Sequence, residues 1–151
     1  MKTSKLKIII IILISLIAII SLVFSCACKK EVVLNKTELA FLNLVNDARI
    51  QNNLNPLTPN QKLMDIAKSR CIDMAARNYF SHWTPEGNRV KQGEILGRSN
   101  INIGVEKYIK AWLQSPTHKE VILDSEYKKI GISVTDNNDK RIVTIIFSSR
   151  R

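Results

Sequence analysis

The last strand-like segment, residues 141–148, constrains the fold of this 151-residue chain more than any other feature. It contains Ile142, Val143, Ile145, Ile146 and Phe147, so both faces of an extended strand would be apolar here. Such a strand suits the centre of a sheet that is covered on both sides, rather than a half-solvated edge. Residues 130–135 alternate apolar with small or polar residues, and residues 136–139, Asp-Asn-Asn-Asp, read as a turn. The two segments therefore predict a C-terminal β-hairpin.

Helical patterns precede this hairpin. Apolar residues at helical spacing predict a helix over residues 37–51, and Thr58-Pro59-Asn60-Gln61 reads as the start of a second helix, with Thr58 as N-cap, that extends to about residue 78. Residues 81–103 predict a loop with one short strand at 94–98. A third helix should begin near residue 105 and end before Pro116, and a short fourth helix should end near residue 123. Helices followed by a hairpin predict an α+β domain with three layers.

The N-terminal segment has the layout of a targeting signal. Residues 8–24 are apolar except for two serines, three lysines precede this run, and small residues follow it. A bare membrane anchor is the competing interpretation, for which a 17-residue run is short. Residues 23–26, Val-Phe-Ser-Cys, resemble a bacterial lipoprotein cleavage box in which Cys26 becomes the lipidated first residue. We therefore expect a signal peptide over 1–25, a lipidated tether over 26–36 and one folded domain over 37–151.

The net charge and the number of cysteines exclude few classes of function by themselves. The formal net charge of +10 falls to +7 without Lys2, Lys5 and Lys7, and such a surface could attract polyanions. The lysines are scattered, however, and no basic run exceeds two residues, so we expect no specific nucleic-acid binding. If Cys26 carries lipid, the remaining cysteines give no disulfide framework, and Cys71 is expected to be a small buried hydrophobe.

The two histidines are the strongest chemical signal. His82 lies in Tyr-Phe-Ser-His-Trp-Thr-Pro-Glu-Gly (79–87), His118 ends Trp-Leu-Gln-Ser-Pro-Thr-His (112–118), and Glu94 stands between them after a glycine. These three side chains can exchange protons near neutrality or ligate a metal ion. The chain lacks the spacing of metalloproteases, two histidines on one helical turn with an adjacent glutamate, and no serine or cysteine has a recognisable activating partner.

These motifs and their order resemble the CAP superfamily, also called SCP, in its bacterial secreted branch. The resemblance covers roughly residues 39–147. It rests on Leu-Val-Asn-Asp-Ala-Arg (44–49), Leu-Asn-Pro-Leu-Thr (54–58), the His82 motif, Gly93-Glu94, and Trp112 followed by Ser115-Pro116 and His118. Together with the leader, the chain is similar to a spirochaete, Borrelia-like, surface CAP lipoprotein.

The resemblance implies an α-β-α sandwich with a cleft in which two histidines and one or two glutamates converge. Carried over by motif, His82, Glu94 and His118 occupy three of these places, and Ser115 stands at the fourth. Phe80, Trp83 and Ser115 are expected to form the cleft wall. The site is therefore expected to be reduced.

Three functions follow from this expectation. The first is a monomeric, non-enzymatic module at the outer membrane that binds a host or envelope ligand, either protein, lipid or sterol, and requires no cofactor. The second is a metal-dependent hydrolase, in which two imidazoles and a carboxylate hold a divalent metal such as zinc and lower the pKa of its bound water to about 7. The third is a binder of polyanions such as glycosaminoglycans. We favour the first, because the fourth site residue is replaced.

Overall fold

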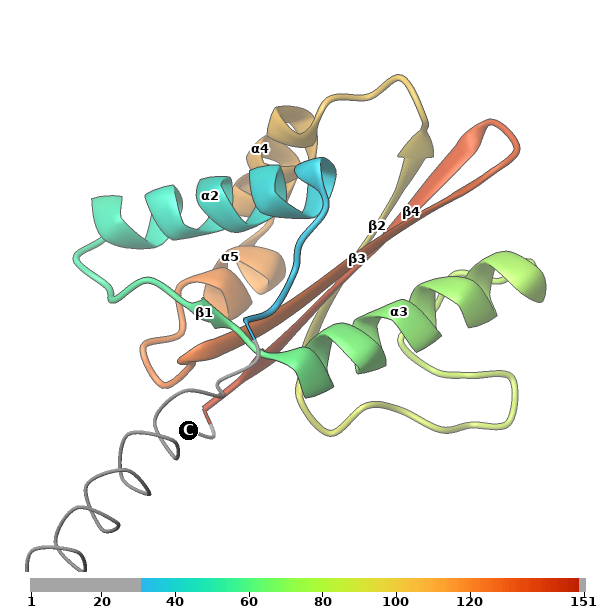
Figure 1. Cartoon of the computed structure of the whole chain (residues 1–151), viewed down its shortest axis with the longest axis horizontal. Helices are drawn as coiled ribbons and strands as arrows, with labels where there is room; N and C mark the ends of the chain where they lie inside the picture. Colours follow the sequence, from blue (N-terminus) through green and yellow to red (C-terminus); the bar gives the residue numbers. More distant parts are fainter. Residues whose placement is uncertain (1–30, 150–151) are drawn as a thin grey trace, which may run out of the picture. The chain divides into compact units, whose positions relative to one another are not determined.

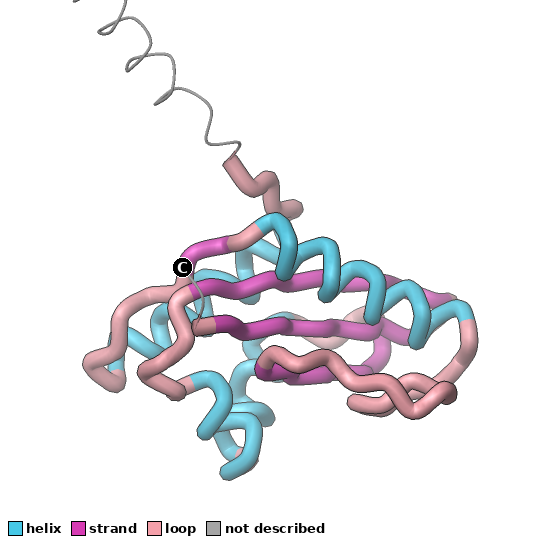
Figure 2. The backbone as a smooth tube through the Cα atoms, turned by 90° about the horizontal axis from the view of Figure 1, so that it is seen from below, coloured by secondary structure: helices cyan, strands magenta, loops and turns pink. Residues whose placement is uncertain are grey.

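A four-stranded sheet in the order β1-β3-β4-β2 forms the middle of the molecule. Its strands are β1 (Thr58–Pro59), β2 (Gly93–Asn100), β3 (Lys129–Asn137) and β4 (Lys140–Ser148). β3 and β4 form an antiparallel hairpin, β2 pairs antiparallel with β4, and β1 pairs parallel with β3. The computed structural model describes residues 31–149 and places the strands side by side (Figures 1 and 2). It confirms the hairpin and the central position of its second strand.

Helices cover both faces of this sheet. α2 (Lys36–Gln51), α4 (Val105–Gln114) and α5 (Pro116–Ile122) lie on one side, and α3 (Gln61–Ala76) lies on the other (Figure 1). In β4, Val143, Ile145 and Phe147 join the core cluster that contains residues of α2, α4 and α5, whereas Ile142 and Ile146 pack with residues of α3. Both faces of the strand are therefore buried, and the predicted three-layer α+β architecture is confirmed.

The α3 face of the sheet also holds Cys71. Its thiol is fully buried and lies 3.3 Å from both the Ser133 carbonyl oxygen and the Thr144 hydroxyl oxygen. Burial raises the pKa of the Cys71 thiol, although these hydrogen bonds oppose the shift. The residue is a structural part of the core, as expected from the sequence.

Two predicted boundaries are wrong. Thr58 does not cap a helix, because Thr58 and Pro59 are extended and pair with β3: the Thr58 N–H donates to the Lys128 carbonyl. The N-cap of α3 is Asn60, whose side-chain oxygen accepts from the Leu63 N–H at 3.2 Å. β2 is also longer than the predicted strand at 94–98, since all eight of its residues pair with β4. Pairing with an apolar neighbour overrides the weak strand pattern of the segment.

The start of the folded unit precedes residue 37. Asn35 caps α2 by accepting hydrogen bonds from the N–H groups of Thr37 and Glu38, and the Glu38 carboxylate accepts one from the Asn35 N–H. Val32 and Leu34, within the stretch expected as a tether, pack against the main core. Within residues 31–149, no helix is long and apolar enough to cross a membrane. The apolar run at 8–24 and Cys26 lie outside the described residues, so the signal peptide and its lipid stay predictions.

Arg49, the last residue of the 44–49 motif, is fully buried and acts as a structural clamp. Its guanidinium donates to the backbone carbonyl oxygens of Asn55, Ile122, Asp124 and Tyr127, at 2.7–3.2 Å. These carbonyls belong to the loop after α2, to the last residue of α5 and to the segment that joins α5 to β3. One side chain thus satisfies several buried acceptors and fixes the connections that lead into the sheet.

Candidate functional site

Glu94 is the centre of the candidate site. It is the second residue of β2, opposite Ile146 of β4, and its side chain is completely buried. One carboxylate oxygen, Oε1, accepts from Nε of Arg70 at 2.9 Å, and the other, Oε2, lies 2.7 Å from Nδ1 of His82. A buried carboxylate needs an opposite charge and hydrogen-bond donors. Arg70 supplies the charge, and Arg70 and His82 contact the two oxygens.

Arg70 is the site residue that sequence reasoning missed. It lies on α3 and is buried, and besides Glu94 it donates to the Tyr79 hydroxyl at 2.8 Å and to the Ser81 carbonyl at 2.6 Å. Burial opposes the charge, but the bonds to Glu94 and Tyr79 outweigh it and raise the pKa of the guanidinium. The available signal was its position: Arg70 follows Ala67 by three residues and precedes Met74 by four, on the apolar face of the helix.

His82 lies in the loop that connects α3 to β2. Arg70 fixes the start of this loop through Tyr79 and Ser81, and the Tyr79 hydroxyl also donates to Asp73. The His82 side chain is 41% exposed although its Nδ1 is bound to the buried Glu94. Its other ring nitrogen, Nε2, is therefore the atom that a ligand could contact.

His118 presents the same kind of geometry from α5. Its Nδ1 lies 3.0 Å from the Ser115 hydroxyl, one helical turn earlier, so its Nε2 is not the atom that Ser115 engages. Burial, and then the neighbouring His82 imidazole, lower the pKa of His118. The fold thus brings the two histidines together with Glu94 and Ser115. Ser115 therefore has an imidazole within hydrogen-bond distance, which the sequence did not predict.

The donor set fits a metal ion only in part. Among the residues that the structure describes, no three histidine, cysteine, aspartate or glutamate side chains are grouped so that they could hold a metal ion. Glu94 would have to leave Arg70 or His82 to become a direct ligand. The two Nε2 atoms are donors that zinc accepts, with Glu94 orienting one imidazole from behind. Solvent would have to complete the coordination, so a tight three-residue site is not formed.

The aromatic residues of the predicted wall lie at the surface. Trp83 is 54% exposed, with the guanidinium of Arg89 over its ring at 5.8 Å. Phe80 is 36% exposed, and the guanidinium of Arg98 lies over its ring at 4.8 Å. These contacts are cation–π interactions at an accessible surface. The two rings flank His82 in the sequence and leave apolar area for a partner.

Comparisons with known proteins identify the family of the chain. The sequence profile of the CAP, cysteine-rich secretory protein family, matches residues 42–147. An uncharacterized protein of Borreliella burgdorferi is 29% identical to the chain, over 90% of this chain and 96% of that protein.

Solved structures share the fold. An outer surface protein from Borrelia burgdorferi superposes with a TM-score of 0.68 at 23% identity, over 79% of this chain and 97% of that one. The structure of NaASP2 with Zn²⁺ superposes with a TM-score of 0.58 at 13% identity, over 82% and 84% of the two chains. The profile covers most of the described domain, including β2 with Glu94 and both histidine motifs. The chain therefore belongs to the CAP family.

Proposed function

We propose that this CAP protein is a lipid-anchored module of the outer membrane surface that binds a host or envelope ligand without catalysing a reaction. Cys26 would carry the lipid, and the exposed face around Phe80, His82 and Trp83 would contact a protein, lipid or sterol. The fold it shares with the Borrelia burgdorferi outer surface protein supports this location.

The main argument against catalysis is that both carboxylate oxygens of Glu94 are already hydrogen-bonded to protein side chains. A general base needs a free oxygen within reach of a substrate proton, but Oε1 is bound to Arg70 and Oε2 to His82. The side chain is also completely buried, so that a substrate could reach it only by displacing one of these partners. The arrangement supports a role in positioning His82 and its loop.

The nucleophiles of the site region favour the same conclusion. Cys71 is buried and its thiol pKa is raised, which opposes formation of the reactive thiolate. Ser115 contacts His118, but the carboxylate that would orient a catalytic imidazole binds His82 instead. A serine–histidine pair without that third group lacks the arrangement of a catalytic triad.

A metal-dependent hydrolase is the second candidate. It is favoured by one observation: Nδ1 of each histidine contacts another side chain, so Nε2 is the ring nitrogen that each would offer to an ion. The similar fold of NaASP2, whose structure contains Zn²⁺, adds support. When bound, zinc would supply a water of lowered pKa, and Glu94 would keep the His82 ring oriented.

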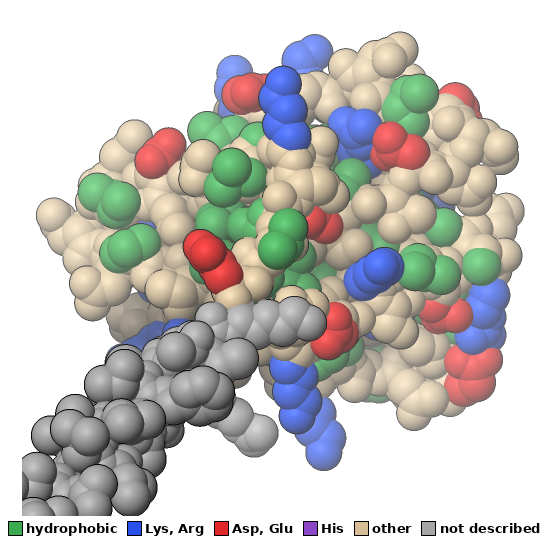
Figure 3. Space-filling model, in the orientation of Figure 1, with side chains coloured by type: hydrophobic (Ala, Val, Ile, Leu, Met, Phe, Trp, Pro, Cys, Tyr) green, Lys and Arg blue, Asp and Glu red, His purple; other side chains and the backbone are tan. Residues whose placement is uncertain are grey.

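The polyanion binder has less support. Arg70 binds Glu94, Arg77 binds Glu86 and Arg141 binds Asp136, so several cations are already neutralised. On the face shown in Figure 3, lysine and arginine side chains are dispersed among acidic and apolar ones and form no continuous basic patch.

Zinc calorimetry with an activity screen distinguishes the two main candidates. We expect weak zinc binding by the unaltered protein, loss of that binding in His82→Ala and His118→Ala, and a thermal midpoint that changes by less than about 2 °C after chelation. Peptide, ester and glycan substrates should remain intact with or without zinc. Turnover that disappears on chelation and in His82→Ala would instead establish the hydrolase.

Cys26→Ser tests the anchor. Cells that express the unaltered chain should incorporate labelled palmitate into it, and external protease should degrade it on intact cells. The serine variant should lose the label and leave the membrane fraction, because a thiol is required for lipid attachment. Cys71→Ser is the matched control and should keep both properties. Retention of the label in the Cys26 variant would contradict the assignment.

A further inference from the structure

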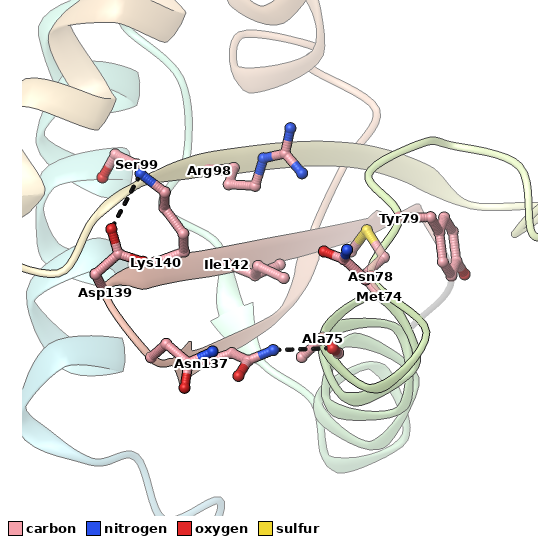
Figure 4. A pocket seen from close by; sticks show the side chains of 11 residues that line it. Met74, Ala75, Asn78, Tyr79, Arg98, Ser99, Asn137, Asp139, Lys140 and Ile142 are labelled. Atoms are coloured by element: carbon pink, nitrogen blue, oxygen red, sulfur yellow. Dashed lines mark hydrogen bonds and ion pairs between the residues drawn. The ribbon is translucent and has the colours of Figure 1, made fainter.

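A separate pocket lies at the end of the sheet that carries the β3–β4 turn. Its walls are the C-terminal end of α3, the second half of β2 and the turn itself, and its volume is about 520 Å³ (Figure 4). Glu94, His82 and His118 do not line it. Pockets that bind small molecules commonly have volumes of a few hundred cubic ångströms, so this one can hold a compact ligand.

The accessible lining of this pocket is mainly polar. Ile142 is 4% exposed and Met74 is fully buried, so they lie behind the lining and offer a ligand almost no apolar surface. Asn78 and Asn137 contribute amide groups, and Asn137 is held in place because its side-chain nitrogen donates to the Ala75 carbonyl at 2.9 Å. The lining therefore suits a small polar molecule.

Arg98 is the cation of this pocket that lacks an acidic partner. Within residues 31–149, no carboxylate forms an ion pair with it, and its guanidinium lies over the Phe80 ring. The second cation, Lys140, lies 3.4 Å from the Asp139 carboxylate and donates to Asn100 at 2.7 Å. The charges of Lys140 and Asp139 offset one another, so the lining has one unpaired positive charge.

Two carbonyls at the C-terminal end of α3 are hydrogen-bonded within the protein. The Ala75 carbonyl accepts from the Asn137 side chain, and the Met74 carbonyl accepts from the Tyr79 N–H at 3.2 Å. These two carbonyls of the last turn of α3 thus have partners inside the protein. The Arg98 N–H groups remain as strong donors for a ligand.

We propose that this pocket binds a small organic monoanion, whose carboxylate pairs with Arg98. A guanidinium offers two parallel N–H donors that match the two oxygens of a carboxylate. The ring of Phe80 limits the positions of the guanidinium and thereby orients these donors. The carboxylate belongs either to a free short-chain acid or to the C-terminal residue of a peptide.

Titration of the full chain in a non-ionic detergent tests the site. The probes are hexanoate and an N-acetylated dipeptide with a free C-terminus, each compared with its uncharged amide. We expect at least one acid to bind with a Kd on the order of 1 mM, to shift the backbone NMR signals of Ser99, Asn137 and Lys140, and to bind at least ~10-fold more tightly than its amide. Preference for one acid identifies the source of the carboxylate.

Variants of two arginines complete the experiment. Arg98→Gln should weaken acid binding at least ~10-fold, and Arg98→Lys should weaken it less, because a lysine keeps the charge but not the paired donors. Arg89→Gln is the matched control, since Arg89 also lies over an aromatic ring but is not part of the pocket. The proposal is overturned if neither acid shifts these signals at about 10 mM, if acid and amide bind equally, or if Arg98→Gln binds like the unaltered chain.

Discussion

Arg70→Met is expected to lower the free energy of unfolding by about 3–5 kcal/mol. The substitution keeps much of the side-chain volume but removes the cation that binds Glu94 at 2.9 Å inside the protein. Glu94 would then be a buried carboxylate with His82 as its remaining partner. The bonds from Arg70 to Tyr79 and Ser81 would also be lost, so the loop that carries His82 should loosen. Urea unfolding followed by circular dichroism measures the loss.

A second substitution separates the charge effect from lost packing. Glu94→Gln in the Arg70→Met background removes the unpaired carboxylate, so the double variant should be more stable than the sum of the two single losses predicts. Arg77→Met is the matched control, because Arg77 binds Glu86 at the surface, and its unfolding midpoint should stay close to that of the unaltered protein. Strictly additive losses for Arg70 and Glu94 would show that the pair does not act as a unit.

The site could be predicted in part because its chemistry is concentrated in rare residues. Only two histidines exist, and their motifs and Glu94 could be assigned from sequence order alone. Arg70 could not be found in this way, because it is the one arginine in the sequence of α3 and no neighbouring residue forms a chemical motif with it. Its partner lies 24 positions away on a strand, and only the packing of α3 against the sheet brings the two together.

The fold followed from patterns that depend on local sequence. Because β4 is apolar on both faces, helices must cover the sheet on both sides. This holds regardless of how the loops connect the helices and strands. The error at Thr58 has the opposite origin. The threonine-proline sequence at 58–59 is typical of a helix start. In the fold, however, the preceding loop places Thr58 next to β3, where its backbone pairs with Lys129. Tertiary contacts thus decided between two local structures of similar propensity.

Gly131→Ala is expected to destabilise the protein by about 3 kcal/mol or more, because β3 approaches α3 too closely for any side chain at this position. A Cβ atom on Gly131 would lie 2.1 Å from the carbonyl carbon of Leu63 and 2.5 Å from the backbone nitrogen of Met64. These are backbone atoms of the first turn of α3, which Asn60 caps, so they cannot rotate away. The whole helix would have to move from the sheet and open the cluster of Leu63, Ala67 and Ile146.

The same displacement should reach the candidate site, since α3 carries Arg70. A shift of the helix lengthens the bond from Arg70 to Glu94, so Gly131→Ala should also increase protease cleavage in the loop that contains His82 and Trp83, at temperatures well below unfolding. Gly104→Ala is the control: its Cβ would meet only the end of the flexible Glu106 side chain, and the expected cost is at most about 1 kcal/mol. Equal stability of the two variants would mean that α3 can move without breaking the core. The position of Arg70 would then depend on Glu94 itself, rather than on the packing of the helix.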